Sequence, residues 1–299
     1  MTYVVAQKFG ERVVILSDTM ITDPNGTRAN AIPGRLKAIV LSGDVSLAYA
    51  GNSEWGLQCT RKAHQVLHDS GFDAALNVIV AGSSDVERKT EFLIVRHAPN
   101  AKLMKVSQGS CSTTESGFVI GDNVSRSVHR LLESPTSINK ELEFVSQEEI
   151  VFTQSFMSMF INGDVRTASG VGGVPVNLLC SPNGHTYQGH SFAASFDKVS
   201  VRTGVTEEQL RDRASGMNEY RMATMDSKFR GVGVLACYLP AARTGYIYDP
   251  IKQDDAIKVR LLDPSSDWQP REHQMMKSLN NILEEHAASY DYSFEYKGS

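Results

Sequence analysis

The order of elements along the chain predicts a mixed α/β protein of the α+β type, folded as a four-layer α-β-β-α sandwich. Two apolar strand pairs, turning at Gly10-Glu11 and Gly43-Asp44, come first. A helical stretch, more strands, a second helical region and a hairpin follow, up to about residue 190. Two sheets with helices outside them satisfy this order.

The first half of the predicted sandwich begins with residues 3–9 and 12–17, which are rich in β-branched side chains and indicate a hairpin. Residues 22–34 contain Asp-Pro-Asn-Gly and Pro-Gly, which are typical of a loop. Residues 36–41 and 45–50 form the second strand pair.

A helix is expected to begin near residue 52, with Asn52 or Ser53 as its cap. Its apolar side chains share one helical face, formed by Trp55, Cys59, Ala63, Val66 and Leu67. Residues 72–80 are predicted to continue as helix.

The middle of the chain supplies the remaining layers. The expected strands are 91–95, 102–106 and 117–121, the expected helices are 122–132 and one opening at Ser146, and the hairpin covers 175–187. The capping-box pattern Ser146-Gln-Glu-Glu149 marks the second helix start.

Beyond residue 190 the pattern is less regular. We expect a helix over 206–225, strands over 231–238 and 245–248, and an amphipathic helix over 270–288. The predicted division is a core of residues 1–190 and a C-terminal extension, 191–299, that packs on the core or at subunit interfaces.

Composition narrows the classes of function. The 299 residues carry a net charge of -4, which gives no reason to expect a nucleic acid or an anionic membrane as partner. No apolar run approaches the roughly 20 residues of a membrane helix, and no secretory signal is recognisable. The four cysteines form no metal or redox pair, which favours free thiols and a cytoplasmic location.

Metal binding is not expected. His64 and His68 have the spacing of a helical metal pair, but no Glu lies between them in the zincin pattern and no third ligand is evident. We interpret them as part of a solvated helix face, and we expect no metal and no cofactor.

Thr2 directly follows the initiator Met, and aminopeptidases remove Met before a small side chain. Removal would leave Thr2 with a free α-amine beside its own hydroxyl. The reference pKa of an α-amine is about 7.7–8.0, so the amine can accept the hydroxyl proton near neutral pH. A threonine at position 2 is common, however, and by itself carries no function.

Three later residues strengthen this hypothesis. The first hairpin brings Asp18 back level with the start of the chain, and Lys37 opens the next strand pair. A lysine beside a hydroxyl favours the alkoxide, and an acid holds that lysine charged. Gly51 lies where a strand ends and a helix begins, so its backbone N–H can face an oxyanion.

These stretches resemble the N-terminal-nucleophile hydrolases of the proteasome β-subunit type and their bacterial relatives. The matching segments are Thr2-Tyr-Val-Val-Ala6, Val14-Ile-Leu-Ser-Asp18, Lys37-Ala-Ile-Val40 and Ala48-Tyr-Ala-Gly51, with weaker matches to about residue 190. The resemblance implies the N-terminal-nucleophile hydrolase fold and a threonine peptidase without a cofactor.

Roles follow from the resemblance position by position. Thr2 would be the nucleophile and its amine the base, with Lys37 tuning the pKa, Asp18 orienting Lys37, Gly51 forming the oxyanion hole and Asp164 supporting the amine. Ile21, Thr22, Tyr49 and Ser53 fall where the family lines its substrate groove. Because Tyr49 is bulky, we expect a narrow pocket for small or uncharged side chains.

The resemblance also implies a ring or another homo-oligomer that acts on peptides or unfolded proteins, with room for an ATPase unfoldase as partner. Two alternatives stay open: a catalytically inactive assembly subunit on the same fold, and a small-amide acylase with the same chemistry.

Overall fold

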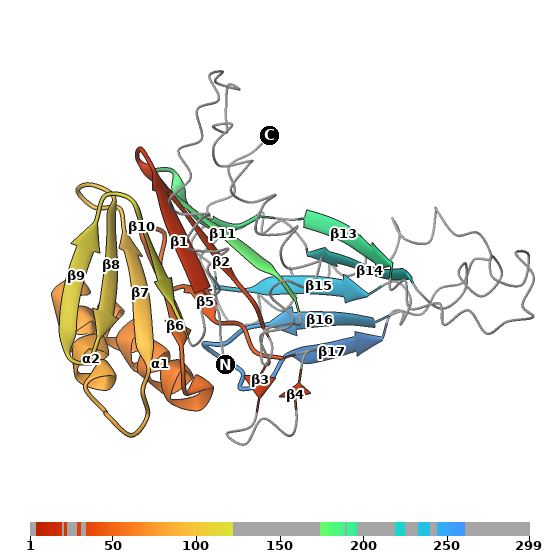
Figure 1. Cartoon of the computed structure of the whole chain (residues 1–299), viewed down its shortest axis with the longest axis horizontal. Coiled ribbons are helices and arrows are strands. Elements are labelled where there is room, and N and C mark those ends of the chain that lie inside the picture. The colour runs from red at the N-terminus through yellow and green to blue at the C-terminus, as the bar shows by residue number, and fades with distance from the viewer. Residues whose placement is uncertain are drawn as a thin grey trace, which may run out of the picture.

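The computed structural model describes residues 4–19, 21–22, 29–30, 34–121, 174–188, 190–195, 219–224, 233–239 and 244–260. Within these residues the protein is mixed α+β, with three five-stranded antiparallel sheets, one short strand pair and two helices (Figure 1). The expected α+β class is therefore confirmed at this level.

The first sheet has the strand order β10-β1-β2-β11-β12. Its strands are β1 (Val4–Phe9), β2 (Arg12–Ser17), β10 (Gly117–Ile120), β11 (Val176–Ser181) and β12 (Gly184–Tyr187). The two predicted hairpins, β1–β2 and β11–β12, are both present, because Gly10 and Gly184 adopt the positive φ that tight turns need.

The second sheet has the order β5-β6-β7-β8-β9. Its strands are β5 (Ala38–Val40), β6 (Val45–Ala50), β7 (Glu91–Arg96), β8 (Lys102–Ser107) and β9 (Ser110–Thr114). The first four match the expected strands. The fifth, β9, was not predicted, because an exposed edge strand of Ser, Cys and Thr shows no apolar alternation.

Both helices cover one face of this second sheet, with α1 (Ser53–Ser70) against β6 and α2 (Phe72–Ser83) against β7, β8 and β9. As predicted, Asn52 caps α1: its side chain accepts a hydrogen bond from the Trp55 amide at 3.0 Å. The expected continuous helix is instead interrupted at Gly71, whose φ of 84° ends α1 and lets the chain turn into α2.

The two sheets lie face to face, with β10, β1 and β2 opposite β7, β6 and β5. Alternate residues of β1 and β2, namely Val4, Ala6, Val13 and Ile15, enter the shared core. The residues between them, Val5, Val14 and Leu16, are buried as well. Residues 4–6 of β1 and 13–17 of β2 are thus buried on both faces.

The third sheet has the order β13-β14-β15-β16-β17. Its strands are β13 (His190–Ser195), β14 (Glu219–Thr224), β15 (Leu235–Leu239), β16 (Thr244–Tyr248) and β17 (Ile257–Arg260). The helix expected over 206–225 is wrong for residues 219–224, which pair with β13 and β15. Ladder pairing on both sides outweighs a weak helical pattern.

Residues beyond 190 share the core of the earlier ones. Leu235, Cys237 and Tyr248 belong to the same hydrophobic cluster as β1, β2 and β6. Gly233 lies so close to β5 that an added Cβ would meet the Val40 carbonyl oxygen at 2.6 Å. The Arg61 side chain on α1 donates to the Pro250 carbonyl at 2.7 Å. The described part of the extension therefore packs on the core.

Smaller differences concern the predicted loop over residues 22–34. Two short strands, β3 (Ile21–Thr22) and β4 (Ala29–Asn30), pair at its start and within it. The helices expected over 122–132, from Ser146 and over 270–288 lie outside the described residues.

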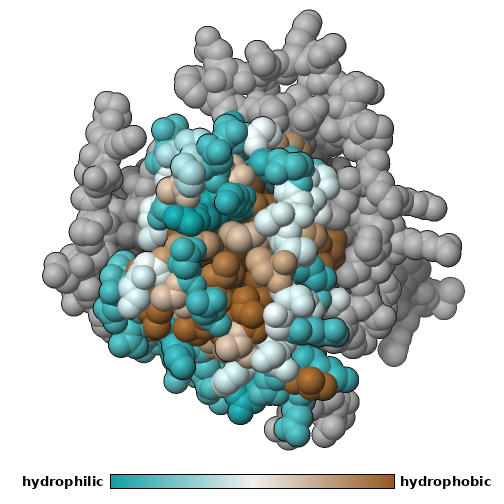
Figure 2. All heavy atoms as spheres, turned by 90° about the vertical axis from the view of Figure 1, so that its left-hand side faces the viewer, coloured by the Kyte–Doolittle hydropathy of each residue, from teal (hydrophilic) through white to brown (hydrophobic). Residues whose placement is uncertain are grey.

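One face of the molecule, at the left of Figure 1 where β9 and α2 lie, has hydrophobic side chains at its centre and hydrophilic ones around them (Figure 2). On α2, Leu76, Val78 and Val80 are half-buried and pack against the core. Within the described ranges, no helix is long and apolar enough to cross a membrane.

Candidate active site

A buried ion pair joins the two facing sheets at one end. Asp18 directly follows β2, and Lys37 directly precedes β5. The Lys37 Nζ donates to the Asp18 Oδ1 at 2.9 Å, and both side chains have an exposed fraction of 0%. The sequence predicted this pair, and the structure brings it together.

The electrostatics of this pair set it apart from a surface salt bridge. Burial lowers the pKa of the Lys37 ammonium, while the charge and the hydrogen bond of Asp18 oppose that shift. A buried ion pair contributes little net stability, because desolvating two charges offsets most of their attraction. Charged groups held this way are candidates for chemistry rather than for packing.

Backbone hydrogen bonds fix the surroundings of the pair. Thr19 accepts from the Arg35 amide through its carbonyl and from the Val174 amide through its hydroxyl, each at 2.7 Å. The Tyr49 amide donates to the Lys37 carbonyl at 3.0 Å. The end of β2, the start of β5, the end of β6 and the start of β11 therefore meet around Asp18 and Lys37.

Gly51 lies at the same end of the sheets, directly after β6 and two residues before α1. Its φ of 105° is a conformation that favours glycine. Among the residues the structure describes, none accepts a hydrogen bond from the Gly51 amide. An amide donor of this kind, near a helix N-terminus, suits a developing negative charge.

The expected groove residues occupy different environments. Tyr49 is fully buried: its hydroxyl donates to the Leu36 carbonyl at 3.2 Å, and burial raises its pKa. Its ring lies against Gly56 of α1, where an added Cβ would come within 2.3 Å. Ile21 and Ser53 are half-buried, and Thr22 lies in β3. Thr2 and Asp164 lie outside the described residues.

A cavity of about 550 Å³ opens beside Gly51. Its lining includes Gly51, Ser83, Asp85, Lys89, Glu91 and Gly121. Glu91 pairs with the Lys105 Nζ at 2.8 Å and accepts from the Gly121 amide at 3.2 Å. Sequence reasoning missed the cavity residues between 83 and 91, since they form a polar loop without a recognisable motif.

A second buried polar cluster lies at the opposite end of the sheets, beside the turns at Gly10-Glu11 and Gly43-Asp44. His185 Nδ1 contacts the Ser46 Oγ at 2.7 Å, and His185 Nε2 contacts the His97 Nδ1 at 2.7 Å. The far nitrogen of His97, Nε2, lies 2.7 Å from the Glu11 carbonyl oxygen.

The proton positions in this second cluster follow from its last member. A carbonyl only accepts, so His97 Nε2 carries a proton and, in a neutral ring, Nδ1 accepts from His185. His185 in turn accepts from the Ser46 hydroxyl. Burial, and then the neighbouring His97, lower the pKa of His185 to about 3. Sequence analysis missed this cluster, because its two histidines are 88 residues apart.

The remaining candidates form no site. The His64 and His68 rings lie 4.7 Å apart, edge to face, and burial lowers the pKa of His64 to about 4. Within the described ranges, no three His, Cys, Asp or Glu side chains gather as a metal site. Cys59, Cys180 and Cys237 are buried free thiols, whereas Cys111 is free and exposed.

Comparison with known proteins adds no assignment: no model of a protein family matches the chain, and no curated protein matches it significantly.

Proposed function

We propose that this protein is a threonine peptidase of the N-terminal-nucleophile class, similar to proteasome β-type subunits. The observation that carries the proposal is the buried Asp18–Lys37 pair at the sheet end that also holds Gly51. Thr2 lies two residues before Val4, and Val4 pairs with Ser17 beside Asp18.

The proposed reaction uses only groups of the chain and water. After removal of Met1, the Thr2 amine takes the hydroxyl proton while Oγ attacks a peptide carbonyl, and the Gly51 amide donates to the oxyanion. The C–N bond then breaks, the leaving amine takes the proton, and an ester to Thr2 remains. A water molecule then attacks the ester and gives a proton to the α-amine of Thr2. The acyl product is released, and the Thr2 hydroxyl is restored.

Lys37 and Asp18 would support the nucleophile electrostatically. The Lys37 charge favours the alkoxide of Thr2 and lowers the pKa of the neighbouring amine, so that more of the amine is unprotonated near neutral pH. Asp18 holds Lys37 in one orientation at 2.9 Å. Asp164 is assigned to the support of the amine, and Ile21, Thr22 and Ser53 to the substrate groove; Tyr49, which is fully buried, is not part of its lining.

The four-layer sandwich belongs to the same proposal. Its support is the pair of facing sheets, the helices α1 and α2 on the outer face of one of them, and the burial of residues 4–6 of β1 and 13–17 of β2 on both faces. A sheet buried on both faces is a middle layer. A homo-oligomeric ring in the cytoplasm that degrades peptides or unfolded proteins, with or without an ATPase unfoldase, completes the proposal.

The decisive experiment treats the purified protein with a threonine-directed epoxyketone or boronate and measures the intact mass and the N-terminal peptide. We expect loss of Met1 and one adduct on Thr2. Thr2→Ala abolishes both the adduct and peptide hydrolysis, whereas Thr2→Ser keeps part of each. Thr113→Ala, at an exposed position on β9, serves as the matched control.

Retained Met1, or an unmodified Thr2, would contradict the peptidase proposal and favour the inactive assembly subunit. An adduct on Thr2 together with hydrolysis of small amides but not of peptides would favour the acylase.

A further inference from the structure

The backbone of Lys89 packs directly against Gly51. An added Cβ on Gly51 would lie 2.2 Å from the Lys89 carbonyl oxygen and 3.1 Å from the Thr90 Cα. Since real Cβ atoms do not approach an oxygen this closely, only glycine fits at position 51 for steric reasons as well as for its φ. The position of the Lys89 carbonyl therefore limits where Gly51 can lie.

Lys89 itself holds an uncommon conformation. Its φ is 41°, and it is one of two non-glycine residues with positive φ among those described. A lysine is strained in this conformation, and such strain persists only where the surroundings enforce it.

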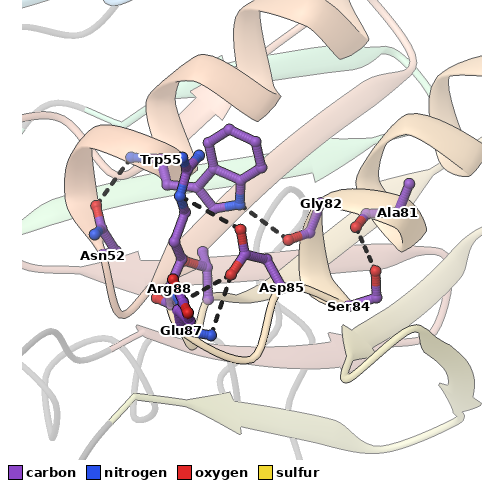
Figure 3. A network of polar contacts seen from close by, with 9 residues as sticks. Asn52, Trp55, Ala81, Gly82, Ser84, Asp85, Glu87 and Arg88 are labelled. Carbon is purple, nitrogen blue, oxygen red and sulfur yellow. Dashed lines mark hydrogen bonds and ion pairs between the residues drawn. The ribbon is translucent and has the colours of Figure 1, made fainter.

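Contacts of Asp85 and Arg88 hold the loop directly before Lys89 (Figure 3). The Asp85 Oδ1 accepts from the Glu87 and Arg88 amides, each at 3.1 Å, and the Lys89 amide donates to the Asp85 carbonyl at 3.2 Å. The Arg88 guanidinium lies 3.8 Å from the centroid of the Trp55 ring, a cation–π contact.

The same contacts tie the loop to the helix that follows Gly51. Trp55 belongs to α1, and its indole N–H donates to the Gly82 carbonyl at the end of α2, at 2.9 Å. Gly51, the cap Asn52, Trp55 and the loop of residues 84–90 thus form one connected unit. The cavity beside Gly51 is lined by this loop.

We propose that Lys89 is a positioning residue, which uses its left-handed backbone to fix the direction of the Gly51 amide. This inference rests on the proposed function, in which that amide stabilises the oxyanion. A donor must lie about 2.7–3.1 Å from the developing oxyanion, and loss of one donor typically lowers kcat by about 10²–10³. A displaced loop would therefore reduce kcat without weakening substrate binding.

Two substitutions separate backbone geometry from side-chain charge. Lys89→Asn removes the charge but tolerates positive φ, whereas Lys89→Val removes the same charge and is strongly disfavoured there. With a fluorogenic peptide substrate, we expect the kcat of Lys89→Asn to exceed that of Lys89→Val severalfold. Lys89→Val should lower kcat about tenfold or more and change KM by less than about twofold.

Equal kcat values for the two variants would overturn the positioning role, whether both match the wild type or both fall below it. If Lys89→Val does not fold, Arg88→Ala, which removes the contact with Trp55, is expected to lower kcat with an unchanged KM, and an unchanged kcat would overturn the inference. Failure of the proposed function is recognised separately, since the wild type would then form no Thr2 adduct.

Discussion

The two ends of the facing sheets both enclose a buried polar cluster, but the clusters differ in charge. At one end, Asp18 and Lys37 form a fully buried ion pair at 2.9 Å. At the other end, Ser46, His185 and His97 form a chain of contacts that ends on the Glu11 carbonyl, each contact being 2.7 Å.

The two clusters differ in how much they contribute to the stability of the fold. The histidine chain is satisfied while neutral, because every donor in it has an acceptor, and such a network makes the packing of the two sheets specific. The ion pair requires two desolvated charges and gives little net stability in return. Polar groups that stabilise the fold thus lie at one end, and groups suited to chemistry lie at the other.

The largest effect is expected from breaking the ion pair. Lys37→Met leaves the Asp18 carboxylate buried without its ammonium partner, which should lower the free energy of unfolding by about 3–5 kcal/mol. Urea denaturation monitored by circular dichroism measures this loss. The double variant Asp18→Asn/Lys37→Met removes both charges and should recover most of the stability while remaining inactive. Equal losses of unfolding free energy in the single and double variants would contradict the view that the unpaired Asp18 carboxylate causes the loss.

The cluster of Ser46, His185 and His97 should make the free energy of unfolding depend on pH. The pKa of His185 is about 3 in the folded protein and about 6.5 in an unfolded chain, so below pH 6.5 protons bind preferentially to the unfolded state. The free energy of unfolding should fall between pH 6.5 and 3, by at most about 1.4 kcal/mol per pH unit from this residue. The groups facing His185 are His97, Ser46 and, beside Ser46, the Cys180 thiol.

Urea denaturation at a series of pH values tests this dependence. His185→Gln should flatten the profile between pH 6.5 and 3. His64→Gln is the comparison: the pKa of His64 is about 4, so its removal should flatten the profile only above pH 4, and the slope between pH 4 and 3 distinguishes the two histidines. An unchanged slope in His185→Gln would show that His185 does not cause the pH dependence of the free energy of unfolding.

The smallest effects are expected from deleting one hydroxyl at each end. Ser46→Ala removes the donor to His185, and Tyr49→Phe removes the donor to the Leu36 carbonyl. Each should cost about 1–2 kcal/mol of unfolding free energy. Peptide hydrolysis should distinguish them. It should fall in Tyr49→Phe, because the lost hydroxyl holds the carbonyl of Leu36, the residue directly before Lys37, and it should remain unchanged in Ser46→Ala. Equal hydrolysis rates would remove the functional distinction between the two ends.

Prediction from sequence succeeded where the signal is local. The turns at Gly10-Glu11 and Gly43-Asp44, and the cap at Asn52, depend on residues within a few positions of each other. Prediction failed for residues 219–224, where ladder pairing on both sides decides the conformation, and for β9, whose edge position needs no apolar alternation.

The sequence by itself determined the hairpins and the start of α1, because turn and cap residues act within a few positions of each other. Asp18 and Lys37 come from the two facing sheets, so the packing of those sheets brings them together. Only the tertiary structure decided which distant groups meet at each end of the sheets. The Lys89 carbonyl against Gly51, and His97 against His185, join segments with no shared local pattern. Such contacts depend on how the sheets and helices pack, since burial and close approach are properties of the whole fold.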